Sequence, residues 1–515
     1  MAEQETQSLP ESADVVVIGG GAAGATLAGL LAERSNRSVL VLEAGPDYGP
    51  YTEGRWPQGL VDGRNYPVGS HSWNYTSSAK YGERGLVLDR ARVLGGCSSH
   101  NGCAAVWGHR VDYDGWAALG NPGWSADDLL PFFQAADQRM RVRTPAAGEL
   151  GAFHEAFLDA MPAAGLERID NLNDMDGGTG MAISPINVWN GVRWNAAFAA
   201  LDPVRDRANL AIRGDVLADR LVLEGSRVTG IDVIGPHGPA RVRAGEVVVS
   251  GGAYGSPALL LRSGIGPEEH LRQVGVAVQH ALPGVGENLH DHPAILLTFQ
   301  GTDELLGRLN GFMEHHVLRE EGVISKARSS LSSGPFDLHL YPIGSPYWLG
   351  NGEWLFAIPI ATMTTRSRGT LRLASTDPES PPIMDHGYLT DEDDHDLTVL
   401  LDGLDIARDM VSHAPLRQLL GPQTSPAPDM LDREALRTHI RANSVHYYHP
   451  VGTCKMGPAS DPLAVVDARG RVHGLQGLRV ADAAIMPFVP RANTNIPSVV
   501  VGARVAALML EEERA

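Results

Sequence analysis

The sequence predicts an α/β fold in which a Rossmann-like domain is joined to a second domain built on an antiparallel sheet. Residues 14–19 read DVVVIG, a β-branched run ending in glycine, which is typical of a buried strand in a parallel sheet. A glycine cluster, a helical stretch at 25–34 and a second apolar run at 38–45 follow in the order of a βαβ unit. Between residues 295 and 435, short strand-like segments separated by turn residues favour an antiparallel sheet.

The other elements are predicted from local patterns along the chain. Residues 124–140 predict a helix with Ser125 as its N-cap. Residues 208–250 alternate apolar and polar types, which predicts a meander of short strands that ends in a second buried run at 247–249. A short helix is expected from residue 256. Further strands are expected at 295–301, 337–343, 354–362 and 369–375, and further helices at 393–411 and 496–513.

Charge and hydropathy exclude several classes of partner. The chain has 515 residues, and 42 Lys and Arg against 61 Asp and Glu give a net charge of 42 − 61 = −19. Affinity for nucleic acids and for anionic membranes comes mainly from cationic side chains, so neither partner is expected. The sequence contains no apolar run of about 18 residues, so we predict no transmembrane helix.

The N-terminus and the cysteines bear on location. The first dozen residues, MAEQETQSLPES, are polar and acidic, so we expect a disordered tail and no signal peptide. Three cysteines are too few for a disulfide framework and suit a reducing compartment. We interpret Cys97 and Cys103 as buried, inert thiols, and we expect a cytoplasmic protein.

A dinucleotide fingerprint follows the first predicted strand. Gly19, Gly21 and Gly24 form GxGxxG between that strand and a helix. These glycines let the backbone approach a pyrophosphate at the helix N-terminus. Glu43 ends the second strand and is placed to accept a hydrogen bond from a ribose hydroxyl. The motif predicts an adenine dinucleotide; it does not separate FAD from NAD, and Glu43 disfavours NADP.

Six longer motifs are spread along the chain. They lie at 91–116 (ARVLGGCSSHNGCAAVWGHRVDYDGW), 251–267, 282–293, 367–373, 447–457 (YYHPVGTCKMG) and 477–487. Together with the glycine fingerprint they resemble the motifs of the glucose–methanol–choline (GMC) oxidoreductase family over nearly the whole chain. The resemblance implies FAD as the cofactor, oxidation of an alcohol to a carbonyl compound and a two-domain fold.

The resemblance also implies how the chain is divided. A discontinuous FAD-binding domain would comprise residues 12–150, 206–295 and 435–515. An antiparallel-sheet substrate domain would comprise residues 151–205 and 296–434. The substrate would enter between the two domains, over the flavin, where ligand sites commonly lie.

Further cofactor contacts are implied by the same family motifs. The string GGCSSHN is similar to that of the choline-oxidising branch, in which this histidine is covalently joined to the flavin. We therefore expect a covalent bond through His100; the alternative is a histidine packed beside the flavin without a bond. The other implied contacts are Ala44, Trp73, Arg92, Val93, Gly95, Gly96, Ser98, Asn101, Gly102, Val216, Asp482, Ala483 and Thr494.

Two residues near the C-terminus match the catalytic pair of the family. His449 lies in HPVGT, and Asn493 lies in RANTN. Alcohol oxidation removes a proton from oxygen and a hydride from carbon, and a histidine can accept that proton. A neighbouring amide can hold the alcohol oxygen in line with flavin N5. We predict His449 and Asn493 as catalytic and interpret His446 as structural.

Several other histidines and acidic residues are not expected to take part in catalysis or metal binding. The HDH triplet at 290–292 has no accompanying Cys or carboxylate cluster, so we expect no metal site. His315 and His316 are adjacent; they are expected at the surface, and the alternative is that they line a substrate pocket. The acidic stretch 391–396 is interpreted as a solvated helix start, where the helix dipole favours negative charge.

The substrate is expected to be an uncharged primary alcohol, either aromatic or of medium chain length. The choline-oxidising branch holds its cation with a carboxylate beside paired tryptophans, and no such string occurs in 296–340. Glu314 is the nearest candidate carboxylate there, while Tyr341, Tyr447 and Tyr448 add bulk near the catalytic histidine. Oxygen is the expected electron acceptor. The alternatives are a dehydrogenase that uses a quinone or protein acceptor, and a non-redox hydroxynitrile lyase. A homodimer is also expected.

Overall fold

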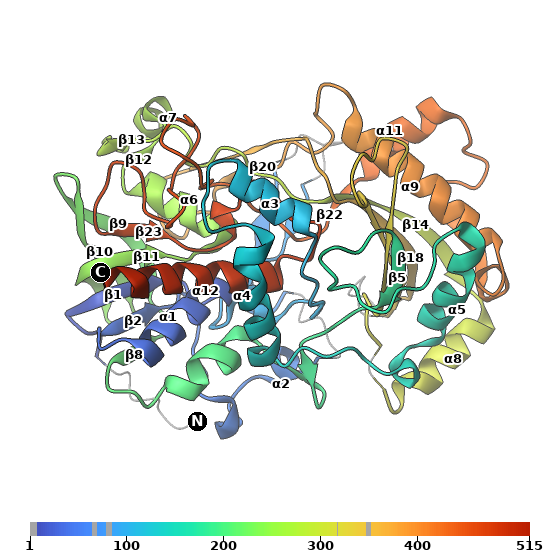
Figure 1. Ribbon diagram of the computed structural model, residues 1–515, viewed down its shortest axis with the longest axis horizontal. Helices are drawn as coiled ribbons and strands as arrows, with labels where there is room; N and C mark the ends of the chain where they lie inside the picture. Colours follow the sequence, from blue (N-terminus) through green and yellow to red (C-terminus); the bar gives the residue numbers. More distant parts are fainter. Residues whose placement is uncertain (1–7, 64–68, 79–84, 317, 347–351, 515) are drawn as a thin grey trace.

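The structure is a computed structural model that describes residues 8–63, 69–78, 85–316, 318–346 and 352–514. Figure 1 shows two sheets side by side, a mostly parallel one next to the C-terminus and an antiparallel one at the opposite end of the molecule. The predicted α/β fold is therefore confirmed. The predicted N-terminal tail lies outside the described residues as far as residue 7, and Ser12 already begins the first strand.

The first sheet runs in the order β8-β2-β1-β11-β10-β9, with β23 paired to the end of β11. Strands β8, β2, β1, β11 and β23 pair in parallel, and β11, β10 and β9 form an antiparallel meander. Its strands are β1 (Ser12–Ile18), β2 (Val39–Leu42), β8 (Leu210–Arg213), β9 (Leu217–Glu224), β10 (Arg227–Gly235), β11 (Gly238–Val249) and β23 (Leu478–Val480). The apolar ends of β1 and β2 are fully buried, which explains why they read as continuous hydrophobic runs.

Two helices pack together beside this sheet. Helix α1 (Ala22–Arg34) follows β1, and α12 (Asn495–Glu512) closes the chain alongside it (Figure 1). Their backbones approach closely, because a Cβ on Gly502 would lie 2.2 Å from the Ala23 carbonyl oxygen. Glycine at 502 thus lets the last helix cover the first βαβ unit.

The second sheet is antiparallel and runs in the order β21-β14-β18-β16-β15-β5. Its strands are β5 (Gly180–Ile183), β14 (Pro293–Gly301), β15 (Val323–Ala327), β16 (Leu338–Leu340), β18 (Leu355–Thr362) and β21 (Leu420–Ser425), with β17 (Ile343–Ser345) paired to β18 and β22 (Val445–His446) paired to β14. Helix α9 (His395–Ser412) packs against β14, β16 and β18 through its apolar side.

Shorter elements complete the fold. The remaining helices are α2 (Gln58–Val61), α3 (Arg110–Ala118), α4 (Ala126–Arg139), α5 (Ala152–Ala160), α6 (Gly252–Arg262), α7 (Glu268–Gln273), α8 (Asp303–Met313), α10 (Leu416–Leu419) and α11 (Arg433–Asn443). The remaining strands are β3 (Tyr75–Thr76), β4 (Val87–Leu88), β6 (Val188–Trp189), β7 (Val192–Arg193), β12 (Ile265–Gly266), β13 (His280–Ala281), β19 (Thr370–Arg372) and β20 (Ile383–Asp385).

Most of the predicted elements are confirmed, with two differences. Ser125 caps α4, since its Oγ accepts a hydrogen bond from the Asp128 amide at 3.2 Å. The strand predicted at 369–375 corresponds to β19, which pairs with β20 and does not join the second sheet. The acidic stretch 391–396 is not simply solvated. Asp396 is fully buried, and its carboxylate accepts hydrogen bonds from the Arg366 and Ser367 amides at 2.8 and 2.9 Å.

The domain boundaries stay a prediction, and two segments show why sequence motifs leave them open. Ala197–Leu201, expected in the substrate domain, packs against α1 beside the first sheet. Val445–His446, expected in the FAD domain, forms β22 and pairs with β14 of the second sheet. The two sheets are therefore linked by short segments that cross between them.

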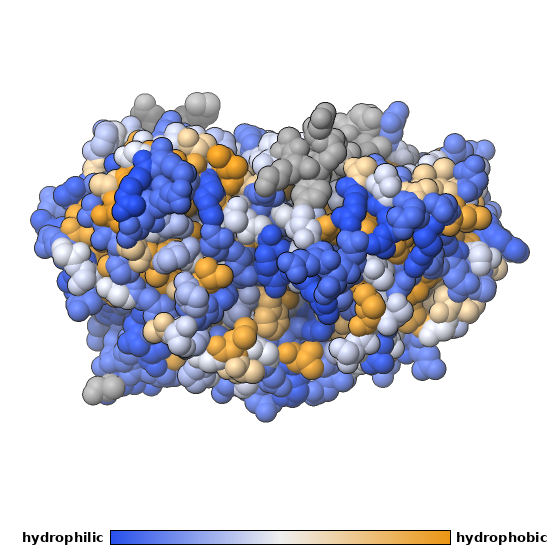
Figure 2. Space-filling model, turned by 90° about the horizontal axis from the view of Figure 1, so that it is seen from above, coloured by the Kyte–Doolittle hydropathy of each residue, from blue (hydrophilic) through white to orange (hydrophobic). Residues whose placement is uncertain are grey.

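One face of the molecule is mainly hydrophilic (Figure 2). Figure 2 shows that face covered mainly by hydrophilic side chains, with hydrophobic ones in small separate groups. Within the described ranges, no helix is both long and apolar enough to cross a membrane.

Candidate active site

A cavity of about 540 Å³ is lined by residues of both sheets. Ile18 of β1 and Leu42 of β2 line one end, and Leu296 of β14, Ile343 of β17 and Pro359 of β18 line the other. This volume is within the range of small-molecule and cofactor sites. The cavity brings the glycine fingerprint and both predicted catalytic residues into one space.

The fingerprint glycines allow backbones to touch at the first end of the cavity. Gly19 has φ +96°, and a Cβ there would lie 2.4 Å from the Ser250 carbonyl oxygen. A Cβ on Gly24 would lie 2.0 Å from the Gly19 carbonyl oxygen, and one on Gly96 would lie 2.7 Å from Gly21 Cα. No side chain caps the N-terminus of α1, so its free amides face the cavity, where an anion would accept their hydrogen bonds.

Glu43 lies just beyond the end of β2 and lines the same end of the cavity. Its carboxylate accepts hydrogen bonds from the Gly20 and Gly45 amides, each at 3.0 Å. Burial raises the pKa of Glu43 to about 7, although both amide hydrogen bonds oppose that shift. The carboxyl thus ties the glycine turn to the following loop and remains placed for a ribose hydroxyl.

Trp73 forms a wall of this end, and Arg92 supports it from behind. The Arg92 guanidinium lies 4.6 Å from the centre of the Trp73 ring. It forms two hydrogen bonds to Glu379 at 2.7 and 2.9 Å, and a third to the Ala44 carbonyl oxygen at 3.2 Å. Arg92 therefore holds the wall in place and does not itself line the cavity.

His100 is buried at the middle of the cavity, directly after the short helical turn 96–99. Burial lowers the pKa of His100 to about 4, so its imidazole is neutral at physiological pH. Its Nε2 is buried and has no hydrogen-bond partner within the described part of the chain. In the tautomer that carries its hydrogen on Nδ1, Nε2 has the free lone pair that a covalent bond to a ligand requires.

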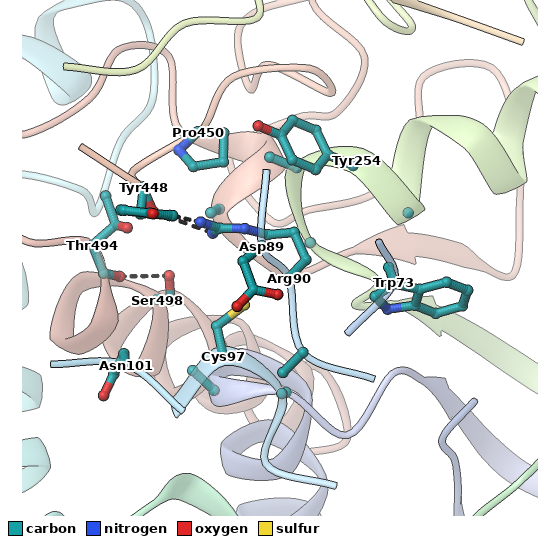
Figure 3. A pocket seen from close by; sticks show the side chains of 18 of the residues that line it. Trp73, Asp89, Arg90, Cys97, Asn101, Tyr254, Tyr448, Pro450, Thr494 and Ser498 are labelled. Carbon is teal, nitrogen blue, oxygen red and sulfur yellow. Dashed lines mark hydrogen bonds between the residues drawn. The ribbon is translucent and has the colours of Figure 1, made fainter. Parts of the chain in front are cut away.

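Cys97 differs from its prediction. It is only partly buried and lines the cavity, where Figure 3 shows it among Asp89, Arg90 and Asn101. Its place follows from Gly96, whose φ of +53° turns the chain so that the next side chain faces inward. Cys103 is buried, as predicted, and burial raises the pKa of its thiol.

His449 follows a strained turn at the second end. Tyr448 has φ +63°, a conformation that bulky residues rarely adopt. The Arg90 guanidinium donates two hydrogen bonds of 3.2 Å to the Tyr448 carbonyl oxygen and holds this turn (Figure 3). The His449 amide donates to Asp291 Oδ1 at 2.9 Å, and its Nδ1 lies 3.0 Å from His292 Nδ1. Burial, reinforced by His292 and Arg90, holds the His449 pKa well below its usual value.

Asp291 organises the loop that carries these histidines. Its Oδ1 also accepts from the His292 amide at 2.6 Å, and its Oδ2 accepts from the Tyr388 hydroxyl at 3.2 Å. Asp291, His292 and His449 offer three ligand-type atoms within 4.8 Å of one another, a grouping that the sequence did not reveal. The Asp291 carboxylate and the two Nδ1 atoms already make hydrogen bonds, whereas His292 Nε2 is buried without a partner among the described residues. The expectation of no metal stays a prediction.

Asn493 lines the cavity, as does His449. Its Nδ2 donates a hydrogen bond to Glu321 Oε2 at 2.9 Å. Its Oδ1 is buried and, among the described residues, has no partner. This leaves one polar atom of the amide for a ligand.

Comparisons with known proteins agree with this geometry. Two family models, both described as GMC oxidoreductase, match residues 13–294 and 365–502. The chain belongs to the GMC oxidoreductase family. It is 34% identical to an oxygen-dependent choline dehydrogenase of Pseudomonas syringae pv. syringae, over 96% of this chain and 92% of the relative. It is 33% identical to choline oxidase of Arthrobacter globiformis, over 96% and 94%. The crystal structure of pyridoxine 4-oxidase from Mesorbium loti superposes with a TM-score of 0.85 at 28% identity, covering 96% and 98%.

As a GMC oxidoreductase, the protein is an FAD-dependent enzyme, and the cavity fits that cofactor. The uncapped helix N-terminus and the glycine cradle suit a pyrophosphate, and the unpartnered Nε2 of His100 suits the flavin. Bound FAD supplies a hydride acceptor.

Most of the residues predicted to hold the cofactor line the cavity. These are Gly19, Gly21, Glu43, Ala44, Trp73, Gly96, Ser98, His100, Asn101, Gly102, Val216, Asp482, Ala483 and Thr494. Gly24, Arg92, Val93 and Gly95 do not line it. Gly24 permits helix packing, Val93 is fully buried, and Gly95 has φ +87° at the start of the turn before His100.

The carboxylate at the substrate end of the cavity is not Glu314, the nearest candidate in the sequence. Glu314 is exposed just after α8 and does not line the cavity. Glu321, seven positions further on in the chain, lines it instead. No local motif marks Glu321, because it is brought to Asn493 only by the pairing of β15 within the second sheet. His315 and His316 are exposed, as predicted.

Proposed function

We propose that this GMC oxidoreductase oxidises an uncharged primary alcohol to the aldehyde, with oxygen as the electron acceptor. The observation that carries the proposal is that a neutral His449 and Asn493 line the same cavity as the glycine fingerprint. The relatives named for choline and pyridoxine support a primary alcohol as the substrate, because both compounds carry one. The proposal that it is uncharged rests instead on the missing carboxylate–tryptophan string of the choline-oxidising branch.

His449 accepts the hydroxyl proton in this proposal. For Nε2 to act as the base, Nδ1 must carry the ring hydrogen and donate it to His292 Nδ1, 3.0 Å away. Asp291 fixes the position of both residues through their amides. Asn493 holds the alcohol oxygen while the carbon faces the hydride acceptor.

The first test is anaerobic addition of benzyl alcohol to the purified flavoprotein. Loss of the flavin absorbance supports alcohol oxidation and excludes the lyase alternative. Hydrogen peroxide formed in air then supports an oxidase, whereas turnover only with a quinone would assign a dehydrogenase. Choline turned over faster than benzyl and aliphatic alcohols would overturn the uncharged substrate.

We also propose a covalent bond between His100 Nε2 and the flavin. Its support is the neutral, buried and unpartnered nitrogen at this position. Acid precipitation tests it directly: yellow colour in the pellet of the wild-type protein, but not of His100→Ala, is the expected result. Colour released from the wild type would leave His100 as a packing residue. The FAD and substrate domain boundaries, the cytoplasmic location and the homodimer also stay predictions.

A further inference from the structure

A polar corner of the cavity lies beside Asn493 and takes no part in the proton transfer assigned to His449. Glu321 precedes β15, and its Oε2 accepts the Asn493 amide hydrogen at 2.9 Å. Among the described residues, only Asn493 makes a hydrogen bond of acceptable geometry with this carboxyl, which leaves Oε1 available to a ligand. The Tyr447 hydroxyl is buried and is likewise without a described partner. Two polar groups at one place in the cavity therefore retain unused hydrogen-bonding capacity.

The Glu321 carboxyl has no neighbouring cation among the described residues. Burial raises its pKa to about 7, and only Tyr447 and Asn493 act in the opposite direction. The Tyr447 hydroxyl lies beside this carboxyl but makes no hydrogen bond of acceptable geometry. A buried polar group that lacks partners is unfavourable unless a ligand or water supplies them.

The walls around this corner are apolar and flat. Tyr341 and Tyr447 stack with ring centres 5.3 Å apart and planes 15° from parallel. Ala294, Leu296 and Ile343 line the same end of the cavity. A ligand that fills this space needs an apolar body and one group that can donate a hydrogen bond to a carboxylate.

We propose that Glu321 is a specificity residue that accepts a hydrogen bond from a second polar group of the substrate. The enzyme then prefers primary alcohols that carry a hydrogen-bond donor on an apolar body. This inference rests on the proposed function, because the same cavity must hold the alcohol. It concerns substrate choice and leaves the roles of His449 and Asn493 unchanged.

The experiment compares matched substrates. We measure kcat/KM for 3- and 4-hydroxybenzyl alcohol and for the corresponding methylbenzyl alcohols. In the wild-type enzyme we expect at least one hydroxy compound to exceed its methyl partner by about 10-fold, the size of a hydrogen bond to a charged group. Glu321→Leu should bring that ratio close to 1. The ratio cancels any general loss of activity that arises through Asn493.

Two further variants serve as a partial rescue and as a control. Glu321→Gln retains an acceptor and the bond to Asn493, so it should restore part of the ratio. Glu314→Gln removes an exposed carboxylate that does not line the cavity, and it should leave the ratio at the wild-type value. An equal ratio in the wild type and Glu321→Leu would overturn the proposal.

Binding provides a readout independent of turnover. The Kd values of 3- and 4-hydroxyacetophenone and of the methyl analogues are measured from the flavin absorbance of the wild type and Glu321→Leu. Weaker binding of the hydroxy compound alone in the variant supports the proposal, and equally weaker binding of both compounds overturns it.

A wild-type enzyme that no alcohol reduces would instead overturn the proposed function. Preference for 4-(aminomethyl)benzyl alcohol that Glu321→Leu abolishes would support the Glu321 subsite while replacing the uncharged substrate with a cationic one.

Discussion

The two ends of the cavity hold their reactive groups in different ways. At the cofactor end the contacts are between backbones, set by Gly19, Gly24 and Gly96 over a few ångströms. At the substrate end the contacts are between side chains from distant segments, as in the pairs His449–His292 and Asn493–Glu321. A single substitution should therefore act differently at the two ends. At the cofactor end it should prevent flavin binding, and at the substrate end it should change the rate of flavin reduction.

The same contrast separates two buried, neutral histidines. His100 leaves its Nε2 without a described partner, whereas His449 is held through its amide and its Nδ1. A free nitrogen suits bond formation to a ligand, and a held ring suits proton transfer at a fixed position. Position in the hydrogen-bond network, more than pKa, thus distinguishes their roles.

The largest effect is expected at the cofactor end, from Gly24→Ala. The new Cβ would lie 2.0 Å from the Gly19 carbonyl oxygen, so α1 and the glycine turn must separate. We expect protein without bound flavin and with a lowered Tm, measured by the ratio of visible to ultraviolet absorbance and by thermal unfolding. Gly59→Ala is the matched control, since no heavy atom lies within 4 Å of its new Cβ. Normal flavin content in Gly24→Ala would contradict the assembly role.

The next effect is expected at the substrate end, from His449→Ala. We expect normal flavin content and a rate of flavin reduction lowered by about 10²–10⁴-fold, the range for general acid–base groups. Stopped-flow reduction under anaerobic conditions measures it. His449→Asn, which keeps a polar side chain, guards against a packing artefact. A rate like that of the wild type in both variants would remove His449 from the mechanism.

A smaller effect is expected from His292→Phe, which removes the acceptor for His449 Nδ1. Without that partner His449 also populates the tautomer whose Nε2 carries hydrogen and cannot accept a proton. We expect the reduction rate to fall by about 10–10²-fold with flavin content unchanged, in line with losses of orienting groups. His292→Asn offers an amide oxygen and should recover part of the rate. Equal loss in the two variants would indicate packing and not tautomer control.

The sequence predicted the cofactor end well because its signals are local. GxGxxG and the apolar runs of β1 and β2 lie within one βαβ unit, so spacing alone predicted their arrangement. The same holds for α4, whose Ser125 cap lies three residues from its partner Asp128. Local alternation also predicted a strand at 369–375, but it does not show that this strand pairs with β20 and stays outside the second sheet.

The substrate end was predicted only where family motifs covered it. His449 and Asn493 came from such motifs, whereas Glu321 has no motif and depends on the register of β15 with β5 and β16. Likewise, residues 290–292 appear in the sequence only as a local triplet. The sequence does not reveal that Asp291 and His292 contact His449, which lies 158 and 157 positions further along the chain. Contacts between distant segments require the fold itself.

The smallest effect is a pH dependence of stability that Glu321 contributes at the substrate end. Burial raises its pKa to about 7 from 4.5, so between these values the folded protein binds more protons than the unfolded chain. Stability from this group is therefore present at low pH and is lost as the pH rises through about 7. The shift corresponds to about 1–2 kcal/mol of folding stability between about pH 5.5 and 7.5, or about 1–2 °C in Tm for a chain of this size.

Thermal unfolding of substrate-free flavoprotein at both pH values should show this loss of stability in the wild type. The loss should be smaller in Glu321→Gln. The exposed Glu314→Gln variant should behave as the wild type. Identical pH dependence in Glu321→Gln and the wild type would mean that water solvates the Glu321 carboxyl. The two ends of the cavity would then differ in their exposure to water as well as in the kind of contact that holds them.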